Sequence, residues 1–284
     1  MPVLQLSVQT DARSCEALEA ACFAAGALSV TLLDAANTPI LEPRLGETPL
    51  WPSIRLVAQF PAETDADGLL AALDLHGAVV ELVPDREWER EWLKDFRPMR
   101  FGARLWVCPL GQEVDARSAV VVSMDPGLAF GTGTHPTTTM CLQWLDGADL
   151  HGREVLDYGC GSGILAIAAL KLGAHSAVAI DIDEQALIAT AANARVNGVA
   201  ERLQILPASE PPPLADVILA NILAEPLIEL APRFASLARK GGQLVVSGIL
   251  ADQAPAVARA GAPWFDMRPF AAREEWVCLE GNRR

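Results

Sequence analysis

The sequence predicts an α/β protein built on a doubly wound, mostly parallel sheet, with a smaller α+β domain ahead of it. Strand-like and helix-like segments alternate over the second half of the chain, which is typical of a parallel sheet covered by helices on both faces. One strand-like run there ends in an acid that is followed by glycines at alternate positions. The first 84 residues show a different order of elements. With 284 residues, the chain is long enough for about two domains.

Residues 1–84 are predicted to form the smaller domain. Apolar alternation predicts strands, and apolar residues at helical spacing predict helices. The expected elements are a strand at 3–8, a helix at 12–25, strands at 28–33 and 54–60, a helix at 65–75 and a strand at 78–83. This order is that of a ferredoxin-like fold, in which both helices cover one face of the sheet.

Residues 85–98 form a charged segment between the two domains. Trp88, Trp92 and Phe96 recur at every fourth position, so a helix would place all three aromatic side chains on one stripe. Pro98 would end this helix. A connecting helix that docks its stripe on one domain is the simpler interpretation, and presentation of the aromatic side chains to a partner protein is the alternative.

Residues 99–284 are predicted to form the larger domain. Strands are expected at 104–108, 119–124, 155–158, 177–181, 203–206, 216–220, 243–247, 264–268 and 276–279. Helices are expected at 136–145, 164–172, 184–196, 224–238 and 252–260. The last two strands are too close together for a crossover helix, so they should pair as an antiparallel hairpin.

A glycine motif marks the expected ligand site. Asp157 ends a strand, and Gly159, Gly161 and Gly163 follow at alternate positions before a helical segment. Such glycines allow the backbone to approach a nucleotide-like ligand closely. Asp181, 24 positions after Asp157 and at the end of the next strand, suits hydrogen bonds to ribose hydroxyls.

Other glycine-rich sequence motifs do not match these residues. A dinucleotide-binding G-x-G-x-x-G would need glycine at Ile164, a phosphate-binding loop would need a lysine, and a G-x-S-x-G elbow around Ser162 fails at Cys160. The acid at 157 stands where a phosphate would bind, so the ligand should carry positive charge and no phosphate. S-adenosylmethionine, with its ammonium and sulfonium groups, meets this requirement. A glycine-rich turn that binds nothing remains the alternative.

Two further segments should flank this ligand. Residues 125–139 are rich in Gly, Thr and Pro, so they are predicted to form a loop that leads into a helix beginning at Pro136. The amides and hydroxyls at that helix start suit a carboxylate. Asn221 directly follows a strand, and its carbonyl could accept a hydrogen bond from an attacking amine. By itself, an asparagine at a strand end is more often a turn residue or helix cap.

Composition narrows the class of partner. The chain carries 22 basic and 36 acidic residues, a net charge of −14, which disfavours nucleic acid and anionic membranes as partners and suits a basic protein. No apolar run is long enough to span a membrane, and no signal peptide is visible. The six cysteines include no C-x-x-C pair, so reduced thiols in the cytoplasm are expected, with no metal site.

The motifs resemble those of class I, Rossmann-like S-adenosylmethionine-dependent methyltransferases. Asp125–Thr139 together with Asn221-Ile222-Leu223 is similar to the bacterial ribosomal protein L11 methyltransferases, over nearly the whole chain. The resemblance implies methyl transfer to amino groups of that large-subunit protein, both lysine side chains and the N-terminal amine, by a monomer that recognises its substrate through the N-terminal domain. Asn221 and Leu223 are expected at the reacting amine. Cofactor contacts are expected at Phe130, Thr137, Thr138, Asp157, Gly159, Gly161, Gly163, Asp181 and Asn221.

Three other functions remain open on sequence alone. The first is a methyltransferase that acts on a different protein, a small-molecule amine or nucleic acid, and the acidic charge disfavours nucleic acid. The second is an NAD-dependent oxidoreductase, which Ile164 in place of glycine disfavours. The third is a non-enzymatic protein that binds basic ribosomal proteins.

Overall fold

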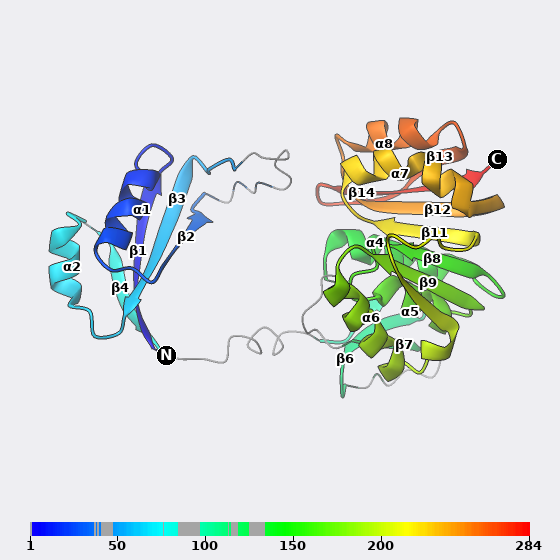
Figure 1. Cartoon of the computed structure of the whole chain (residues 1–284), viewed down its shortest axis with the longest axis horizontal. Coiled ribbons are helices and arrows are strands. Elements are labelled where there is room, and N and C mark those ends of the chain that lie inside the picture. Colours follow the sequence, from blue (N-terminus) through cyan, green and yellow to red (C-terminus); the bar gives the residue numbers. More distant parts are fainter. Residues whose placement is uncertain are drawn as a thin grey trace. The chain divides into compact units, whose positions relative to one another are not determined.

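The structure is a computed structural model of the chain, and it describes residues 2–36, 38, 40, 48–75, 77–84, 97–112, 114, 119–124 and 134–284. The chain divides into two compact units, Met1–Glu91 and Trp92–Arg284, and each is considered by itself (Figure 1). The predicted helix at 85–98, apart from its last two residues, and the loop at 125–133 with Phe130 lie outside the described residues.

The N-terminal unit has the predicted ferredoxin-like fold. Its elements are β1 (Val3–Asp11), α1 (Cys15–Ala24), β2 (Ser29–Asp34), β3 (Ser53–Pro61), α2 (Ala66–Ala72) and β4 (Val79–Val83). The strand order is β2-β3-β1-β4, and every pair is antiparallel. Because side chains alternate along a strand, Leu4 and Leu6 of β1 and Leu56 of β3 share one face, where they pack with Cys22 of α1 and Leu69 of α2.

The first helix starts later than predicted. The sequence pattern places its start at residue 12, whereas α1 begins at Cys15. The Asp11 carboxylate accepts hydrogen bonds from the backbone N–H groups of Arg13 and Ser14, both 2.9 Å. These bonds fold residues 11–14 into a turn, because a side-chain acceptor of this kind competes with helix formation.

The C-terminal unit is the predicted doubly wound sheet. Its strands are β8 (Glu154–Tyr158), β9 (Ser176–Asp181), β10 (Leu203–Pro207), β11 (Ala215–Asn221), β12 (Ala238–Leu250), β13 (Phe265–Arg273) and β14 (Trp276–Arg283). Their order is β10-β9-β8-β11-β12-β14-β13. The first five are parallel, and β14 pairs antiparallel with β12 and β13. The chain winds outward in both directions from β8 and β11, so a ligand is expected at the carboxyl ends of these two strands.

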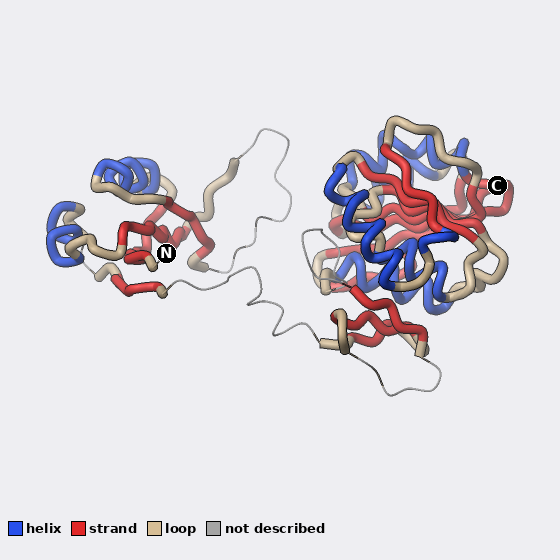
Figure 2. The backbone as a smooth tube through the Cα atoms, turned by 60° about the horizontal axis from the view of Figure 1, so that its bottom comes forward, coloured by secondary structure: helices blue, strands red, loops and turns tan. Residues whose placement is uncertain are grey.

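Helices cover both faces of this sheet (Figure 2). They are α4 (Pro136–Gly147), α5 (Ile164–Lys171), α6 (Glu184–Val196), α7 (Ala224–Leu237) and α8 (Ala254–Gly261), with a short 3-10 turn at Ala200–Arg202. One core contains Val155 of β8 with side chains of α4 and α5. The other contains Leu156 and Tyr158 of β8 with side chains of α7 and α8. This alternation places Asp157 on the same face as α5.

A second small sheet packs on the α4–α5 side. Strands β5 (Met99–Phe101), β6 (Leu105–Pro109) and β7 (Val120–Met124) form it, with β6 and β7 parallel. The sequence predicts strands that correspond to β6 and β7 but does not predict β5. Phe101, Leu105 and Val122 of this sheet are buried in the core shared with α4 and α5.

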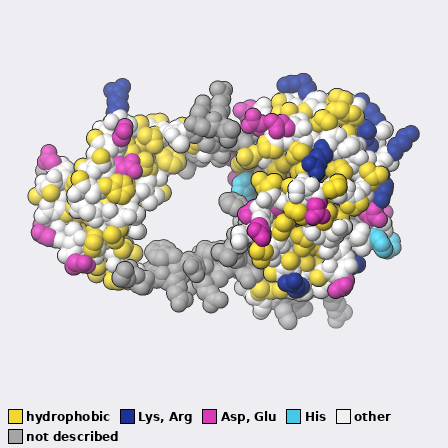
Figure 3. All heavy atoms as spheres, viewed as in Figure 1, with side chains coloured by type: hydrophobic (Ala, Val, Ile, Leu, Met, Phe, Trp, Pro, Cys, Tyr) yellow, Lys and Arg dark blue, Asp and Glu magenta, His cyan; other side chains and the backbone are white. Residues whose placement is uncertain are grey.

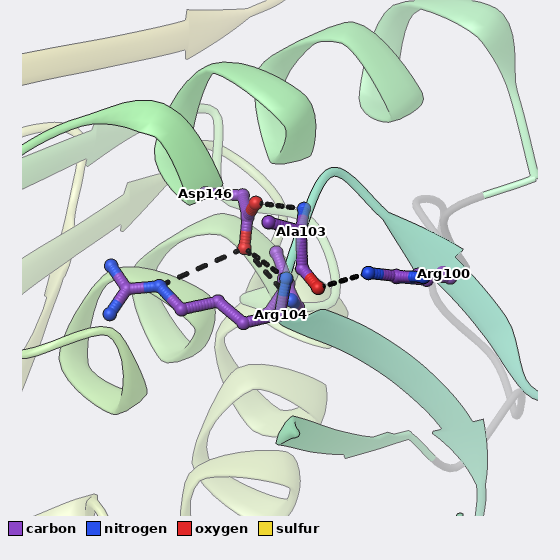
Figure 4. A network of polar contacts seen from close by, with 5 residues as sticks. Arg100, Ala103, Arg104 and Asp146 are labelled. Atoms are coloured by element: carbon purple, nitrogen blue, oxygen red, sulfur yellow. Dashed lines mark hydrogen bonds and ion pairs between the residues drawn. The ribbon is translucent and has the colours of Figure 1, made fainter. Parts of the chain in front are cut away.

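Asp146 of α4 anchors the turn between β5 and β6 (Figure 4). Its carboxylate accepts the backbone N–H groups of Ala103, of Arg104 at 3.2 Å and of Leu105 at 2.8 Å. Gly102 has φ of 75°, and a Cβ there would clash with this carboxylate. The turn and α4 are therefore fixed together.

All six cysteines are buried and free. Among the helices of the described ranges, none is long and apolar enough to cross a membrane.

We expect Asp146→Ala to lower the free energy of unfolding by about 3 kcal/mol, because three backbone donors lose a charged acceptor at a site that is 8% exposed. Urea unfolding of the full chain, followed by tryptophan fluorescence, measures the change. Asp252→Ala is the control, since Asp252 is exposed, and it should stay within about 0.5 kcal/mol of the wild type. Equal stabilities of the two variants would contradict the anchor.

Candidate active site

The glycine motif forms a turn at the carboxyl end of β8. Gly159, Gly161 and Gly163 have φ of 82°, 53° and 78°, a region that side chains with a Cβ seldom adopt. The N–H groups of Gly159 and Cys160 both donate to the carbonyl of Ile180 in β9, at 2.8 and 2.9 Å. The turn is therefore tied to the neighbouring strand, and the sequence prediction of a tight strand–turn–helix connection holds.

Two buried polar residues of α6 donate hydrogen bonds to backbone carbonyls of this turn. The sequence analysis did not identify them. The Thr190 hydroxyl donates to the carbonyl of Gly161 at 3.0 Å, and the Asn193 amide donates to the carbonyl of Ser162 at 2.9 Å. A Cβ on Gly163 would lie 2.7 Å from the Thr190 methyl group. In the sequence, these two residues are polar positions on the buried face of a predicted helix. Such positions are common, so they do not by themselves indicate a functional site.

Asp181 bonds to the same turn. One carboxylate oxygen accepts the N–H of Gly161 at 2.8 Å, and the other accepts the N–H of Asp183 at 3.0 Å. A carboxylate oxygen can accept more than one hydrogen bond, so both oxygens can also receive ribose hydroxyls. The next residue, Ile182, has an apolar side chain that is 92% exposed. The sequence analysis did not identify this residue.

Asp157 lies beneath the turn and is fully buried, at 0% exposure. One of its oxygens accepts the N–H of Ala166 in α5 at 3.0 Å, while Oδ1 has no hydrogen-bond partner among the described residues. Burial raises the pKa of this carboxyl from 3.8 to about 7, the Ala166 hydrogen bond acts in the opposite direction, and the charge of Asp181 adds to the increase. A cation placed beside Oδ1 would favour the ionised form.

The structure brings Asn221 and Thr138 together from positions 83 residues apart. The Asn221 amide nitrogen donates to the Thr138 hydroxyl oxygen at 3.2 Å. Asn221 ends β11, and Thr138 lies in the first turn of α4 with 2% exposure. The strand end and the helix start that the sequence analysis singled out separately thus form one site.

Ile222 packs between two glycines. A Cβ on Gly159 would clash with the Ile222 side chain, and a Cβ on Gly248, within β12, would clash with the Ile222 carbonyl. Leu223 follows as the cap of α7, with an exposed side chain and a carbonyl that accepts the N–H of Leu227 at 3.3 Å. The segment after β11 therefore lies directly against the glycine turn.

His135 caps the start of α4. Its Nδ1 lies 2.8 Å from the Thr137 hydroxyl, and the N–H of Thr137 donates to Nδ1 at 3.4 Å. The ring also packs edge-to-face on Trp276 of β14, with 5.0 Å between ring centroids. The C-terminal hairpin thus supports the helix start that presents Thr138.

These residues fit S-adenosylmethionine. The glycines of the turn have positive φ and no side chain, so they leave room for a ligand. Asp181 could accept hydrogen bonds from ribose hydroxyls. The Asp157 oxygen that has no partner among the described residues could interact with a cationic group. Together with the doubly wound sheet, this arrangement defines a class I S-adenosylmethionine-dependent methyltransferase.

Comparisons with known proteins identify the family. A family model described as ribosomal protein L11 methyltransferase matches residues 2–284. Proteins of that name from Klebsiella pneumoniae (strain 342) and Pectobacterium carotovorum subsp. carotovorum (strain PC1) are each 51% identical, covering all of this chain and 100% and 99% of theirs. The crystal structure of a ribosomal protein L11 methylase from Lactobacillus delbrueckii subsp. bulgaricus is 33% identical, with a TM-score of 0.62 over 66% of this chain and 100% of that one. The chain therefore belongs to the ribosomal protein L11 methyltransferase family.

Asp157 should make stability depend on pH. Its folded-state pKa of about 7 is higher than the ordinary 3.8, so ionisation of this group costs the folded state stability as pH rises from about 4 to about 7. Asp157→Asn removes this cost. We expect the difference between the unfolding free energy of the variant and that of the wild type to increase across this window, by about 4 kcal/mol at most. Urea titrations between pH 4.5 and 8 measure the difference, and a difference that is independent of pH would contradict the assignment.

Proposed function

We propose that this enzyme transfers methyl groups from S-adenosylmethionine to amino groups of ribosomal protein L11, namely lysine side chains and the N-terminal amine. The observation that carries this proposal is the position of Asn221. Its amide nitrogen is bonded to Thr138, its neighbour Ile222 touches the glycine turn, and its carbonyl oxygen has no partner among the described residues. That oxygen can accept an N–H bond from an amine beside the cofactor.

The amine must be neutral to react. A free lysine, with a pKa of about 10.4, costs about 4 kcal/mol to deprotonate at pH 7.5, whereas an α-amine with a pKa near 8 costs less than about 1 kcal/mol. In this proposal the Ile222 side chain, which lies against Gly159 of the glycine turn, excludes water from the bound amine, and this desolvation disfavours the charged form. Desolvation thus lowers the pKa of a bound lysine without a dedicated base.

The remaining task of the protein is alignment. When bound, S-adenosylmethionine supplies a methyl group on a sulfonium, and this carbon passes to the amine nitrogen as the carbon–sulfur bond breaks and its electron pair stays on sulfur. In this proposal Asp181 and the glycine turn would hold the nucleoside end, and the exposed Ile182 side chain would offer an apolar surface to the base. Asn221 holds the amine in line with the methyl carbon, and such alignment accounts for much of the rate gain in two-reactant steps. The methylated amine then releases its extra proton to water.

The N-terminal unit is proposed to recognise the substrate. Residues 1–98 carry 7 basic and 16 acidic residues, whereas residues 99–284 carry 15 and 20. The acidity is therefore concentrated outside the part that holds the cofactor site. Acidic side chains such as Glu63, Asp67 and Asp74 are exposed on this unit, and acidic groups are visible over its surface in Figure 3. Such a surface attracts a basic ribosomal protein.

Asn221→Ala is the first test of this function. We expect turnover on purified L11 to fall by a factor of about 10², because the orienting hydrogen bond is lost. Mass spectrometry counts the 14-Da additions, about one methyl group each, on lysines and on the N-terminus. Calorimetry with S-adenosylhomocysteine is the control for an intact cofactor site. Wild-type turnover in the variant would remove Asn221 from the site, and a wild-type enzyme that adds no methyl to L11 amines would refute the proposed function.

A chain that begins near Arg86 tests the role of the N-terminal unit. It retains the doubly wound sheet and its own cores, so we expect it to fold and to bind S-adenosylmethionine. Methylation of intact L11 should be lost through loss of docking. In the full-length enzyme, added salt should raise KM more than it lowers kcat, because exposed charges are screened. Equal efficiency of the short and full chains on intact L11 would show that the N-terminal unit is not the recognition module.

A further inference from the structure

We propose that Thr190 and Asn193 of α6 are positioning residues for the cofactor, because their side chains hold the glycine turn in the shape that binds S-adenosylmethionine. The two side chains are buried, at 0% and 3% exposure, so they act on the cofactor through the turn and not by direct contact. This inference goes beyond the proposed function, since it concerns cofactor affinity and holds for any methyl acceptor.

The turn needs support from outside because of its own composition. Three of the five residues at 159–163 are glycine, which lets a ligand approach the backbone closely. Glycine adopts positive and negative φ about equally well, so Gly161 and Gly163 do not by themselves favour their φ of 53° and 78°. A cofactor that had to order a flexible turn would bind less tightly.

Helix α6 supplies two hydrogen-bond donors to this turn. The Thr190 hydroxyl donates to the carbonyl of Gly161 at 3.0 Å, and the Asn193 amide nitrogen donates to the carbonyl of Ser162 at 2.9 Å. A carbonyl oxygen only accepts hydrogen bonds, so the direction of both bonds is fixed by chemistry. Two successive peptide units of the turn are therefore held with their carbonyls directed at α6.

The Thr190 side chain meets the turn with its hydroxyl and with its methyl group. A Cβ on Gly163 would lie 2.7 Å from the Thr190 methyl carbon, so this methyl group fills the space beside Gly163. The N–H of Gly161 donates to Asp181 at 2.8 Å, so both polar backbone groups of Gly161 are bonded. Valine at position 190 would keep the methyl group without the hydroxyl, and serine would do the reverse.

The two donors are themselves fixed, because α6 is held at both ends. At its start, the Asp183 carboxylate accepts the N–H of Gln185 at 2.9 Å. At its end, the Asn197 carboxamide accepts the N–H of Ser123 in β7 at 2.8 Å and donates to the carbonyl of Ser123 at 2.7 Å. Asn197 also donates to the carbonyl of Asn193 at 2.8 Å. The turn can therefore be formed before the cofactor binds.

Three variants of the full-length enzyme test the proposal: Thr190→Val, Thr190→Ser and Asn193→Ala. Arg202→Ala is the matched control. The Arg202 guanidinium donates to the carbonyls of Leu170 and Ala174, at 3.3 and 2.9 Å, at the far end of α5 from the turn. We measure the Kd of S-adenosylhomocysteine by calorimetry, the free energy of unfolding in urea, and kcat on L11 at saturating S-adenosylmethionine.

Thr190→Val and Asn193→Ala should each raise the Kd by about 10-fold, because each removes one hydrogen bond that forms the turn. Thr190→Ser should stay within about 3-fold of the wild type. The kcat at saturating cofactor should stay within about 3-fold in all three variants, since the loss is in binding and not in the chemical step. Arg202→Ala should lower the free energy of unfolding and leave the Kd within about 2-fold.

Three results would overturn the proposal. A wild-type Kd in Thr190→Val and Asn193→Ala, together with lower stability, would show that these side chains support only the fold. Equal losses of affinity in Thr190→Ser and Thr190→Val would assign the effect to packing against Gly163. An equal loss in Arg202→Ala would assign it to general destabilisation. If Asn193→Ala does not fold, the nearly isosteric Thr190→Val and its comparison with Thr190→Ser decide the question.

Discussion

The active site depends on how closely the segment after β11 approaches the glycine turn after β8. Ile222 fills the space that a side chain at position 159 would occupy, and its carbonyl lies where a side chain at 248 would be. Only glycine permits this contact from both sides, and both glycines have positive φ, 82° and 83°. The glycine turn and Asn221, the residue proposed to bind the acceptor amine, can therefore be neighbours, which two reacting groups require.

The glycine turn is held from several directions without using its ligand-facing side. Ile180 accepts its first amides, Asp181 accepts the amide of Gly161, and Thr190 and Asn193 of α6 donate to its carbonyls. This leaves the turn pre-formed, so binding a ligand does not have to order it. The exception is Asp157, whose buried Oδ1 has no hydrogen-bond partner among the described residues. An unsatisfied carboxylate is costly in a folded protein, and a cationic ligand would offset that cost.

In the proposed function, the C-terminal unit performs the chemistry and the N-terminal unit recognises the substrate. All described site residues come from the C-terminal unit, between α4 and β14, whereas the strongest excess of acidic residues lies in the first 98 positions. A methyltransferase for a protein needs little specific binding at the reacting nitrogen, because an amine looks alike on any lysine. Recognition by a separate surface fits this requirement, since long-range charge attraction acts over the whole partner.

The sequence by itself determined the elements and most of the candidate residues. The period of apolar residues predicted most of the helices and strands, although β5 was missed and β12 and β13 extend several residues beyond their predicted bounds. The acid–glycine spacing singled out Asp157, Gly159 and Asp181. These features are local, so they can be read from neighbouring positions. The tertiary structure decided the rest. The bond between Thr138 and Asn221, the support of the turn by Thr190 and the complete burial of Asp157 join residues that are far apart in sequence or depend on the packing of whole layers. No local pattern encodes such contacts, because they arise only when parallel strands bring their carboxyl ends to one edge of the sheet.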